Sequence, residues 1–280
     1  MGFGALGLAG LLSRTQAFAG GSEVALKPHF AAKATRVIHI FAQGGPSHVD
    51  TWDPKPELNR RDGQELPEVK GVAMGSNFKF ARHGKSGIEV SEVFPQLAKH
   101  VDDMTVIRSM HTDIPAHDVA TVFMNTGSLR MAKPSLGAWA LYGLGSENEN
   151  MPGFISLRPG GSAPGGVLNW GSAFLPGKYQ ATSINTSSPS VEQMIQNIRN
   201  QYLGAEEQRR QLDFVQKLNH IHQQNLQEDP QLEARIQSFE MAYKMQMEAT
   251  DAFDISRESR ETRDLYTNTP QGRQLLIARR

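Results

Sequence analysis

Two short clusters of histidine, aspartate and hydroxyl side chains could do chemistry in this chain of 280 residues. The first comprises Ser47, His48, Asp50, Thr51 and Asp53, and the second comprises His111, Asp113, His117 and Asp118. Imidazole and carboxylate groups this close together can converge on a divalent metal, and mixed nitrogen and oxygen ligation suits zinc and similar ions. Serine and aspartate also begin turns and cap helices. The structural alternatives are therefore an Asx-type turn packed on Trp52 and, for His117, a helix N-terminal residue bonded to backbone.

Each cluster follows an apolar run that predicts a buried strand. The first run extends from Arg36 to Ala42 and is ended sharply by the sequence Gly-Gly-Pro, and the second extends from Met104 to Ser109. Near-continuous apolar runs are typical of parallel strands that helices cover on both faces. Because neighbouring parallel strands end at the same edge of a sheet, we expect His48 and Asp50 to lie close to His111 or His117.

The remaining chain predicts helices, short strands and loops around that sheet. Helical spacing and caps predict helices over 91–101, 116–125, 134–145, 190–202, 204–226, from 229 onward, and 271–280. The polar stretch 57–87 is interpreted as a surface excursion with a small hairpin, 153–157 as a short strand, and 158–178 as a glycine-rich loop. Trp139 and Tyr142 lie three residues apart, a spacing that favours a place in the core. Met241, Met245 and Met247 are interpreted as gap-filling core residues.

Four strings carry a family resemblance. They are GGPSHVDTWDPKP at 44–56, HDVATVFMNTG at 117–127, PSLG at 134–137 and MPGF at 151–154. Together they resemble the exported family called domain of unknown function 1501, which looks like a branch of the alkaline-phosphatase and sulfatase superfamily. The resemblance implies an α/β fold with an alkaline-phosphatase-like, mixed and mostly parallel sheet flanked by helices, and a long helical segment. It also implies an N-terminal fragment whose C-terminal part is missing, because the last helix would lead to further strands with more metal ligands.

The resemblance assigns chemical roles to both clusters. It implies a divalent metal, which could be zinc, calcium or magnesium, with His48, Asp50, His111 and His117 as candidate ligands. His117 is also the candidate nucleophile, since it stands where a sulfatase-type helix C-x-P-S-R-x-x-x-x-T-G would place that residue, and Ser47 and Thr51 are the fallback nucleophiles. The pattern departs from the sulfatases because Thr121 replaces the arginine and because the chain has no cysteine to become formylglycine.

The N-terminus and the composition bear on location. Residues 1–19 resemble a signal peptide without its basic start, so we expect an exported protein, periplasmic or extracellular, with a twin-arginine pair upstream as the family implies. The apolar run is too short to span a bilayer, so no stable membrane span is expected after signal removal. Lysine plus arginine and aspartate plus glutamate number 29 each, which disfavours nucleic acid as a partner. The expected domains are the signal-peptide remnant 1–19, an N-terminal arm 20–35, the first half of an α/β domain 36–189, a helical segment 190–265, and the truncated start of a second half 266–280.

Two functions fit these observations. The first is an exported sulfatase-like or phosphatase-like, metal-dependent hydrolase of sulfate or phosphate esters on a small molecule or glycan, of which this fragment should be inactive. The second is a non-catalytic exported protein on the same fold that recognises a cell-surface glycan or another partner. Fold resemblance alone does not choose between them.

Overall fold

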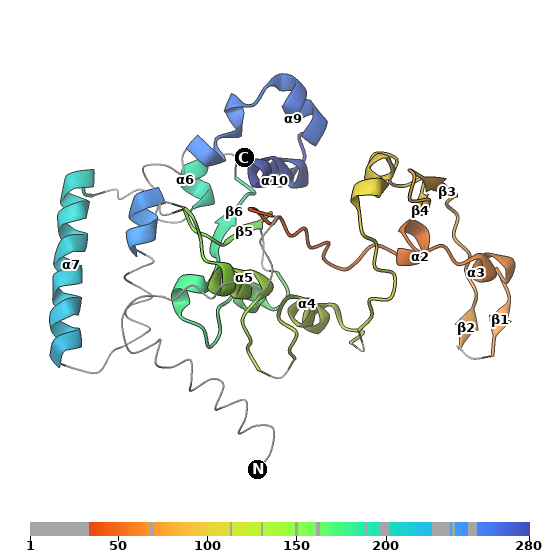
Figure 1. Ribbon diagram of the computed structural model, residues 1–280, viewed down its shortest axis with the longest axis horizontal. Helices are drawn as coiled ribbons and strands as arrows, with labels where there is room; N and C mark the ends of the chain where they lie inside the picture. The colour runs from red at the N-terminus through yellow and green to blue at the C-terminus, as the bar shows by residue number, and fades with distance from the viewer. Residues whose placement is uncertain are drawn as a thin grey trace, which may run out of the picture. The chain divides into compact units, whose positions relative to one another are not determined.

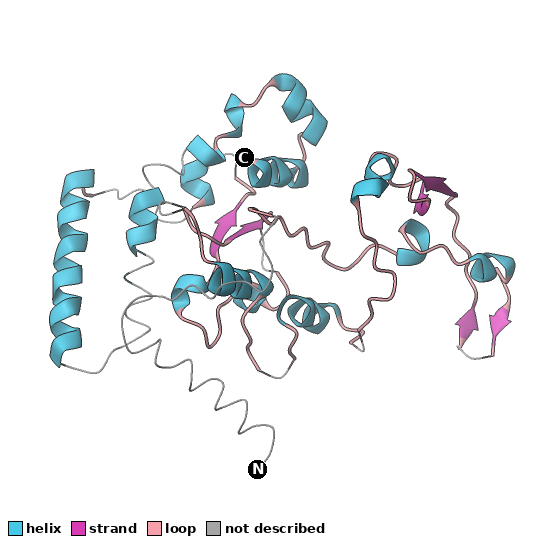
Figure 2. Ribbon diagram, in the orientation of Figure 1, coloured by secondary structure: helices cyan, strands magenta, loops and turns pink. Residues whose placement is uncertain are grey.

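The protein has a mixed α/β structure with small sheets and several helices (Figure 2). The computed structural model describes residues 34–67, 70–112, 114–129, 131–148, 151–160, 163–188, 190–195, 202–225, 236, 239–245 and 251–280. The chain divides into two compact units. The smaller unit comprises residues 39–120, and the larger unit comprises the described residues up to Ile38 together with 121–280.

The smaller unit consists of short helices and two hairpins (Figure 1). Its elements are α2 (His48–Thr51), α3 (Pro56–Arg60), β1 (Glu65–Leu66), β2 (Gly71–Val72), β3 (Phe80–His83), β4 (Ile88–Ser91) and the 3₁₀ helix η1 (Leu97–Asp103). Strand β1 pairs antiparallel with β2, and β3 pairs antiparallel with β4. Val90, Ala98 and Val101 form its buried core, against which Trp52 and Phe94 stack with their ring centroids 5.5 Å apart.

The turn between β3 and β4 depends on a carboxylate from η1. Gly84 and Gly87 have φ angles of 63° and 66°, a left-handed region that glycine enters without strain. The side chain of Asp102 accepts hydrogen bonds from the backbone N–H groups of Lys85 and Ser86, at 2.9 and 2.8 Å. This carboxylate therefore joins the hairpin to η1.

The larger unit surrounds a parallel pair of strands, β5 (Ile155–Arg158) and β6 (Thr182–Asn185). Its other elements are α5 (Leu136–Leu144), η2 (Gly166–Asn169), η3 (Gly177–Tyr179), α6 (Val191–Met194), α7 (Ala205–Asn225), η4 (Ile255–Arg257), α9 (Arg260–Tyr266) and α10 (Pro270–Arg279). Helix α4 (His117–Thr126) begins in the smaller unit and continues into the larger one.

The core of the larger unit joins residues that are far apart in the sequence. Its buried members are Ile184, Met194, Ile195, Met245, Phe253 and Ile277, and Met241 packs against them. The predicted core position of Met241 and Met245 is confirmed, whereas Met247 lies outside the described residues. Helix α10 contacts β5, where Gln274 Nε2 donates to the carbonyl of Leu157 at 2.6 Å. The strand pair is thus covered by a helix from the C-terminal end of the sequence.

The two strands predicted at 36–42 and 104–109 are wrong for this structure. Neither segment forms a strand, and Val37 and Ile40 are 77% and 63% exposed. An extended apolar segment becomes a strand only when a neighbour pairs with its backbone, and sequence does not reveal that neighbour. The single, mostly parallel sheet is also wrong for the described residues, which form three two-stranded sheets of which only β5–β6 is parallel. The mixed α/β class is confirmed, and the alkaline-phosphatase-like fold stays a prediction.

The predicted helices fare better. The predictions at 116–125, 134–145, 204–226 and 271–280 are confirmed by α4, α5, α7 and α10, and the strand at 153–157 by β5. The helix at 91–101 is wrong in its first half, because Ser91 ends β4 and Pro95 disfavours a helix through its missing N–H. In the helix at 190–202 the observed α6 ends at Met194, and 196–201 lie outside the described residues. So do the signal peptide, the arm up to residue 33 and the start of the helix from 229. The expected domain boundaries stay predictions.

Candidate functional site

The first predicted cluster lies on a tight turn followed by the short helix α2. Gly44 and Gly45 have φ angles of 82° and 71°, and the N–H of Gly45 donates to the carbonyl of Ala42 at 3.1 Å. This turn brings Ser47 to the N-cap of α2, with His48 as the first helical residue. Glycine at both positions permits the left-handed backbone that the turn requires.

Asp50 has the most firmly held side chain of this cluster. Ser76 Oγ donates to Asp50 Oδ1 at 2.6 Å, and this bond spans 26 positions of sequence. Hydrogen bonds from the side chains of Ser47 and Ser76 lower the pKa of Asp50 below its usual value. The carboxylate is therefore ionised and oriented at neutral pH.

The segment that supplies Ser76 is itself held by α3 and the turn after it. The backbone N–H of Ser76 donates to Asn59 Oδ1 at 2.8 Å, and the N–H of Gly75 donates to Asp62 Oδ1 at 2.7 Å. The polar excursion predicted at 57–87 thus returns to the first cluster and fixes one of its carboxylates. Sequence reasoning missed Ser76, because no local pattern links it to Asp50.

The other members of the first cluster differ in exposure. His48 is exposed, whereas Thr51 is buried and its Oγ1 donates to the carbonyl of Ser47 at 2.8 Å. Asp53 forms an ion pair with Lys55 at 2.7 Å, and the hydrogen bond from Lys55 lowers the pKa of Asp53. Thr51 and Asp53 are thus engaged with neighbouring groups, and the ligand roles of His48 and Asp50 stay predictions.

The second cluster lies at the start of α4 and in the segment before it. His111 is exposed, with Nδ1 3.5 Å from the carbonyl oxygen of Ser109. His117 is exposed as the first residue of α4, and Asp118 Oδ1 accepts the N–H of Val119 at 2.8 Å. Asp113 lies outside the described residues. The cluster thus presents two imidazoles to solvent.

The predicted metal ligands are not gathered into one site in this structure. His48, Asp50, His111 and His117 all belong to the smaller unit. Within the part of the chain that the structure describes, however, no three histidine, aspartate or glutamate side chains lie close enough together to hold an ion. Imidazole and carboxylate donors suit zinc and similar metals, but too few of these donors lie together to hold an ion. We therefore derive no reaction step through a metal, and the ligand roles stay predictions.

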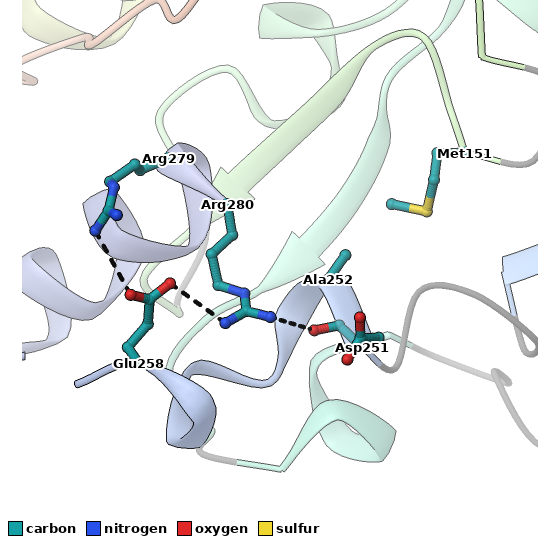
Figure 3. A pocket seen from close by; sticks show the side chains of 6 residues that line it. All are labelled: Met151, Asp251, Ala252, Glu258, Arg279 and Arg280. Carbon is teal, nitrogen blue, oxygen red and sulfur yellow. Dashed lines mark hydrogen bonds and ion pairs between the residues drawn. The ribbon is translucent and has the colours of Figure 1, made fainter.

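A cavity of about 480 Å³ lies in the larger unit, in a region that sequence reasoning did not single out. It is lined by Met151, Asp251, Ala252, Glu258, Arg279 and Arg280 (Figure 3). The carboxylate of Glu258 lies 3.6 Å from the guanidinium of Arg279 and 3.3 Å from that of Arg280. Arg280 also donates to the carbonyl of Asp251 at 3.0 Å. Because the charges in this cavity neutralise one another, the arrangement favours a structural role in joining the end of α10 to η4.

The larger unit also carries a group of aromatic rings, here called the aromatic cluster, which consists of Trp139, Tyr142, Phe174 and Tyr179. The rings meet edge to face, with centroids 5.3 to 6.0 Å apart. Trp139 is 44% exposed and Phe174 is 67% exposed. The predicted core position of Trp139 is wrong, because the loop 170–180 meets one side of α5 without covering this ring. Helical spacing identified the shared face of Trp139 and Tyr142 but not what covers it.

Comparison with known proteins gives one match. Residues 34–280 match the family described as "Protein of unknown function (DUF1501)". No curated protein and no solved structure matches the chain. Among the described residues, every helix falls short of the length or apolar character that a bilayer crossing requires.

Proposed function

The chain belongs to the family described as Protein of unknown function (DUF1501), and from that premise we propose that it is an exported, metal-dependent hydrolase of phosphate or sulfate esters. The observation that carries the proposal is the Asp50 carboxylate, which Ser76 Oγ holds through a hydrogen bond of 2.6 Å, two positions after the exposed His48 on α2. A fixed carboxylate next to an imidazole is half of a mixed nitrogen and oxygen ligand set.

The residues of both clusters would act through position and charge. Ser76 and Ser47 keep the Asp50 carboxylate in one orientation, so that little conformational freedom is lost when a cation or a polar substrate group binds. A divalent ion such as zinc, calcium or magnesium, when bound, would supply polarisation of the ester oxygen. His111 and His117 are the further predicted ligands, and the described residues do not gather three such side chains around one ion.

The three candidate nucleophiles are placed unequally. His117 is exposed at the start of α4, where its ring is accessible to a substrate. Ser47 is exposed, but its hydroxyl group is engaged with Asp50. Thr51 is buried with its hydroxyl group bonded to backbone, so it would have to leave that position before it could attack. The exposure of His117 and the burial of Thr51 put His117 before Thr51 as a nucleophile to test.

Metal titration tests the proposal. Zinc, calcium or magnesium is titrated into the chain by calorimetry, and turnover of an aryl phosphate and an aryl sulfate is measured in the same samples. We expect weak ion binding that His48→Ala and Asp50→Asn each reduce severalfold or more, and little turnover, because three ligands are not gathered. His100→Ala is the matched control, since His100 is an exposed histidine of the smaller unit outside both clusters. Ion binding that both substitutions leave unchanged would overturn the assigned ligands, and robust turnover would show that the active site is already assembled.

A second candidate function is supported by the aromatic cluster. The alternative is a non-catalytic exported protein that recognises a glycan or another partner at the cell surface. A group of large aromatic side chains that remains exposed on a folded unit often marks a binding surface. This function needs no metal and no nucleophile, so absence of ion binding together with retained ligand binding would favour it over the hydrolase.

A further inference from the structure

We propose that the aromatic cluster is a binding site for an acidic oligosaccharide, which means a sugar chain that carries sulfate or carboxylate groups. The inference rests on the binding function just proposed and does not depend on ester hydrolysis. It names the ligand class and the residues of a site in the larger unit, whereas both predicted clusters belong to the smaller unit.

The first observation is the form of the surface. Trp139 comes from α5 and Phe174 from the loop before η3, and their ring centroids lie 5.8 Å apart with the ring planes inclined at 69°. Tyr142 contacts Trp139 edge to face with ring centroids 6.0 Å apart, and Tyr179 contacts Tyr142 in the same way at 5.3 Å. Both supporting rings are only half-buried. Rings held by other rings keep their orientation, so they present a rigid surface at low entropic cost.

Such a surface suits a sugar ring. One face of many pyranose rings presents C–H groups, which pack favourably on the electron-rich face of an aromatic side chain. The hydroxyl groups at the rim of the sugar remain hydrated, so binding does not require a deep cavity. A flat apolar ligand or a hydrophobic protein surface would gain no binding energy from cations near the rings.

The second observation is the charge of the segments that carry the cluster. The sequence contains no aspartate or glutamate from Val119 to Ser146, and none from Met151 to Ser190. Lys178, directly before Tyr179, is exposed, and its Nζ lies 5.1 Å from the centroid of the Tyr179 ring. Lys133 is exposed shortly before α5. Glu147 and Glu149 stand between these two segments, so the charge argument rests on Lys178 at the Tyr179 ring, which favours an anionic ligand.

Arg158 and Trp170 extend the same pattern at the edge of β5. The guanidinium of Arg158 lies 5.3 Å from the centroid of the Trp170 ring, and its Nε donates to Ser183 Oγ at 2.6 Å. Lys178 is the exposed cation at a ring of the aromatic cluster itself, so we assign the ligand's charge to Lys178. The site thus combines two exposed rings for the sugar with one ammonium group for its acidic substituent.

Calorimetry and fluorescence titration of the chain test this site, with EDTA present so that metal-dependent hydrolysis does not contribute. The probes are a sulfated oligosaccharide, a uronate oligosaccharide and a neutral oligosaccharide of equal length. We expect both acidic probes to bind, more weakly as salt is raised, and the neutral probe to bind at least tenfold more weakly. A clear preference between the two acidic probes identifies whether sulfate or carboxylate is the natural substituent.

Variants assign the binding to named residues. Trp139→Ala and Phe174→Ala should each weaken binding of the acidic probes about tenfold or more, as expected for aromatic anchors. Trp139→Phe keeps a ring and should retain most of the affinity, which separates loss of the ring from loss of the fold. Lys178→Gln should reduce the affinity for the acidic probes to that for the neutral probe. Phe214→Ala is the control, because Phe214 on α7 is 61% exposed and lies outside the cluster.

The proposal is overturned if no probe binds at millimolar concentration, or if Trp139→Ala and Phe174→Ala both bind as tightly as the unchanged chain. Equal binding of the neutral and acidic probes would overturn the role of Lys178. Failure of the ester hydrolase proposal is distinguishable from these outcomes, since it appears as loss of metal binding and turnover while oligosaccharide binding in EDTA is unaffected.

Discussion

Each of the two units is stabilised internally by a different kind of contact. The larger unit has an apolar core whose members, such as Ile184, Met245 and Ile277, come from widely separated parts of the sequence. Among its described residues, the smaller unit has a smaller core cluster, which consists of Val90, Ala98 and Val101. It relies in addition on side chains that accept hydrogen bonds from backbone, as Asn59, Asp62 and Asp102 do.

This difference bears on the candidate functional residues, because the contacts that hold them depend on charge. The stabilisation from buried apolar side chains does not depend on pH. A carboxylate that accepts hydrogen bonds from backbone N–H groups stabilises the folded state fully only while it is ionised. The predicted catalytic and metal-binding residues lie in the unit that depends on such carboxylates. We therefore expect the smaller unit to respond to acid and to polar substitutions, and the larger unit to respond to loss of apolar volume.

The largest effect is expected from Ile184→Ala in the larger unit. Ile184 is fully buried on β6, and truncation of a buried isoleucine costs about 2–5 kcal/mol of unfolding free energy. Urea denaturation gives the loss, and hydrogen exchange should localise it to β5 and β6 with little change in β3 and β4. Ile40→Ala is the matched control, because Ile40 is exposed and its truncation should change stability by no more than about 0.5 kcal/mol. Equal losses in the two variants would contradict the core assigned here.

A smaller change in the free energy of unfolding is expected when either of two buried hydroxyl groups of the larger unit is removed, and it should differ between them. Thr186 Oγ1 donates to the carbonyl of Arg158 at 2.8 Å, so Thr186→Val should cost about 1 kcal/mol. Ser135 Oγ is buried and, among the described residues, is the side-chain atom left without a hydrogen-bond partner. Ser135→Ala should therefore leave the free energy of unfolding unchanged or raise it by roughly 1 kcal/mol. Thermal or urea unfolding measures both, and a clear destabilisation by Ser135→Ala would show that its hydroxyl group has a partner in solution.

The smallest expected effect is the loss of stability of the β3–β4 turn in acid, which depends on Asp102 in the smaller unit. Hydrogen bonds from the backbone N–H groups of Lys85 and Ser86 lower the pKa of Asp102 in the folded chain. Its contribution to stability is therefore full above the unfolded value of about 4 and is lost as the pH falls through the lower folded value. Between pH 7 and about pH 2, the protection of the Lys85 and Ser86 amides, measured by hydrogen exchange relative to the intrinsic rate at each pH, should fall less in Asp102→Asn than in the unchanged chain.

Glu57→Gln is the control for that experiment. Hydrogen bonds from Arg60 and Arg61 lower the pKa of Glu57 to about 2, but all three side chains lie exposed on one short stretch around α3. Exposed pairs of this kind contribute little to stability, so Glu57→Gln should leave the exchange of the β3–β4 turn unchanged. If the two variants behave alike, the acid response is a general effect of charge and does not come from the Asp102 contact.

Local signals in the sequence were sufficient for most helices. The predicted span 134–145 became α5 at Leu136–Leu144, with Ser135 at the N-cap and Gly145 ending the helix at a φ of 75°. The span 204–226 became α7 with nearly the same bounds. Helical hydrogen bonds and caps join residues a few positions apart, so one stretch of sequence contains the information that determines them.

Strands were different, because their partners are distant in the sequence. The runs at 36–42 and 104–109 have the apolar composition of strands but no backbone partner in the structure, whereas β5, which is less apolar, pairs with β6 across more than twenty residues. The short hairpin β3–β4 was expected only as a small hairpin somewhere in the excursion 57–87. It extends to Ser91 because Phe80 pairs with that residue and Val90 enters the core.

Residue types and short spacings were enough to predict the family, the mixed α/β class, most helices and the side chains with reactive groups. How those side chains are used became visible in the folded structure. It oriented Asp50 through Ser76, buried the hydroxyl group of Thr51, and left Trp139 exposed beside Phe174. The physical reason is that each outcome depends on a contact, or on the lack of one, with another part of the chain, and such contacts form only when distant segments meet in the folded state.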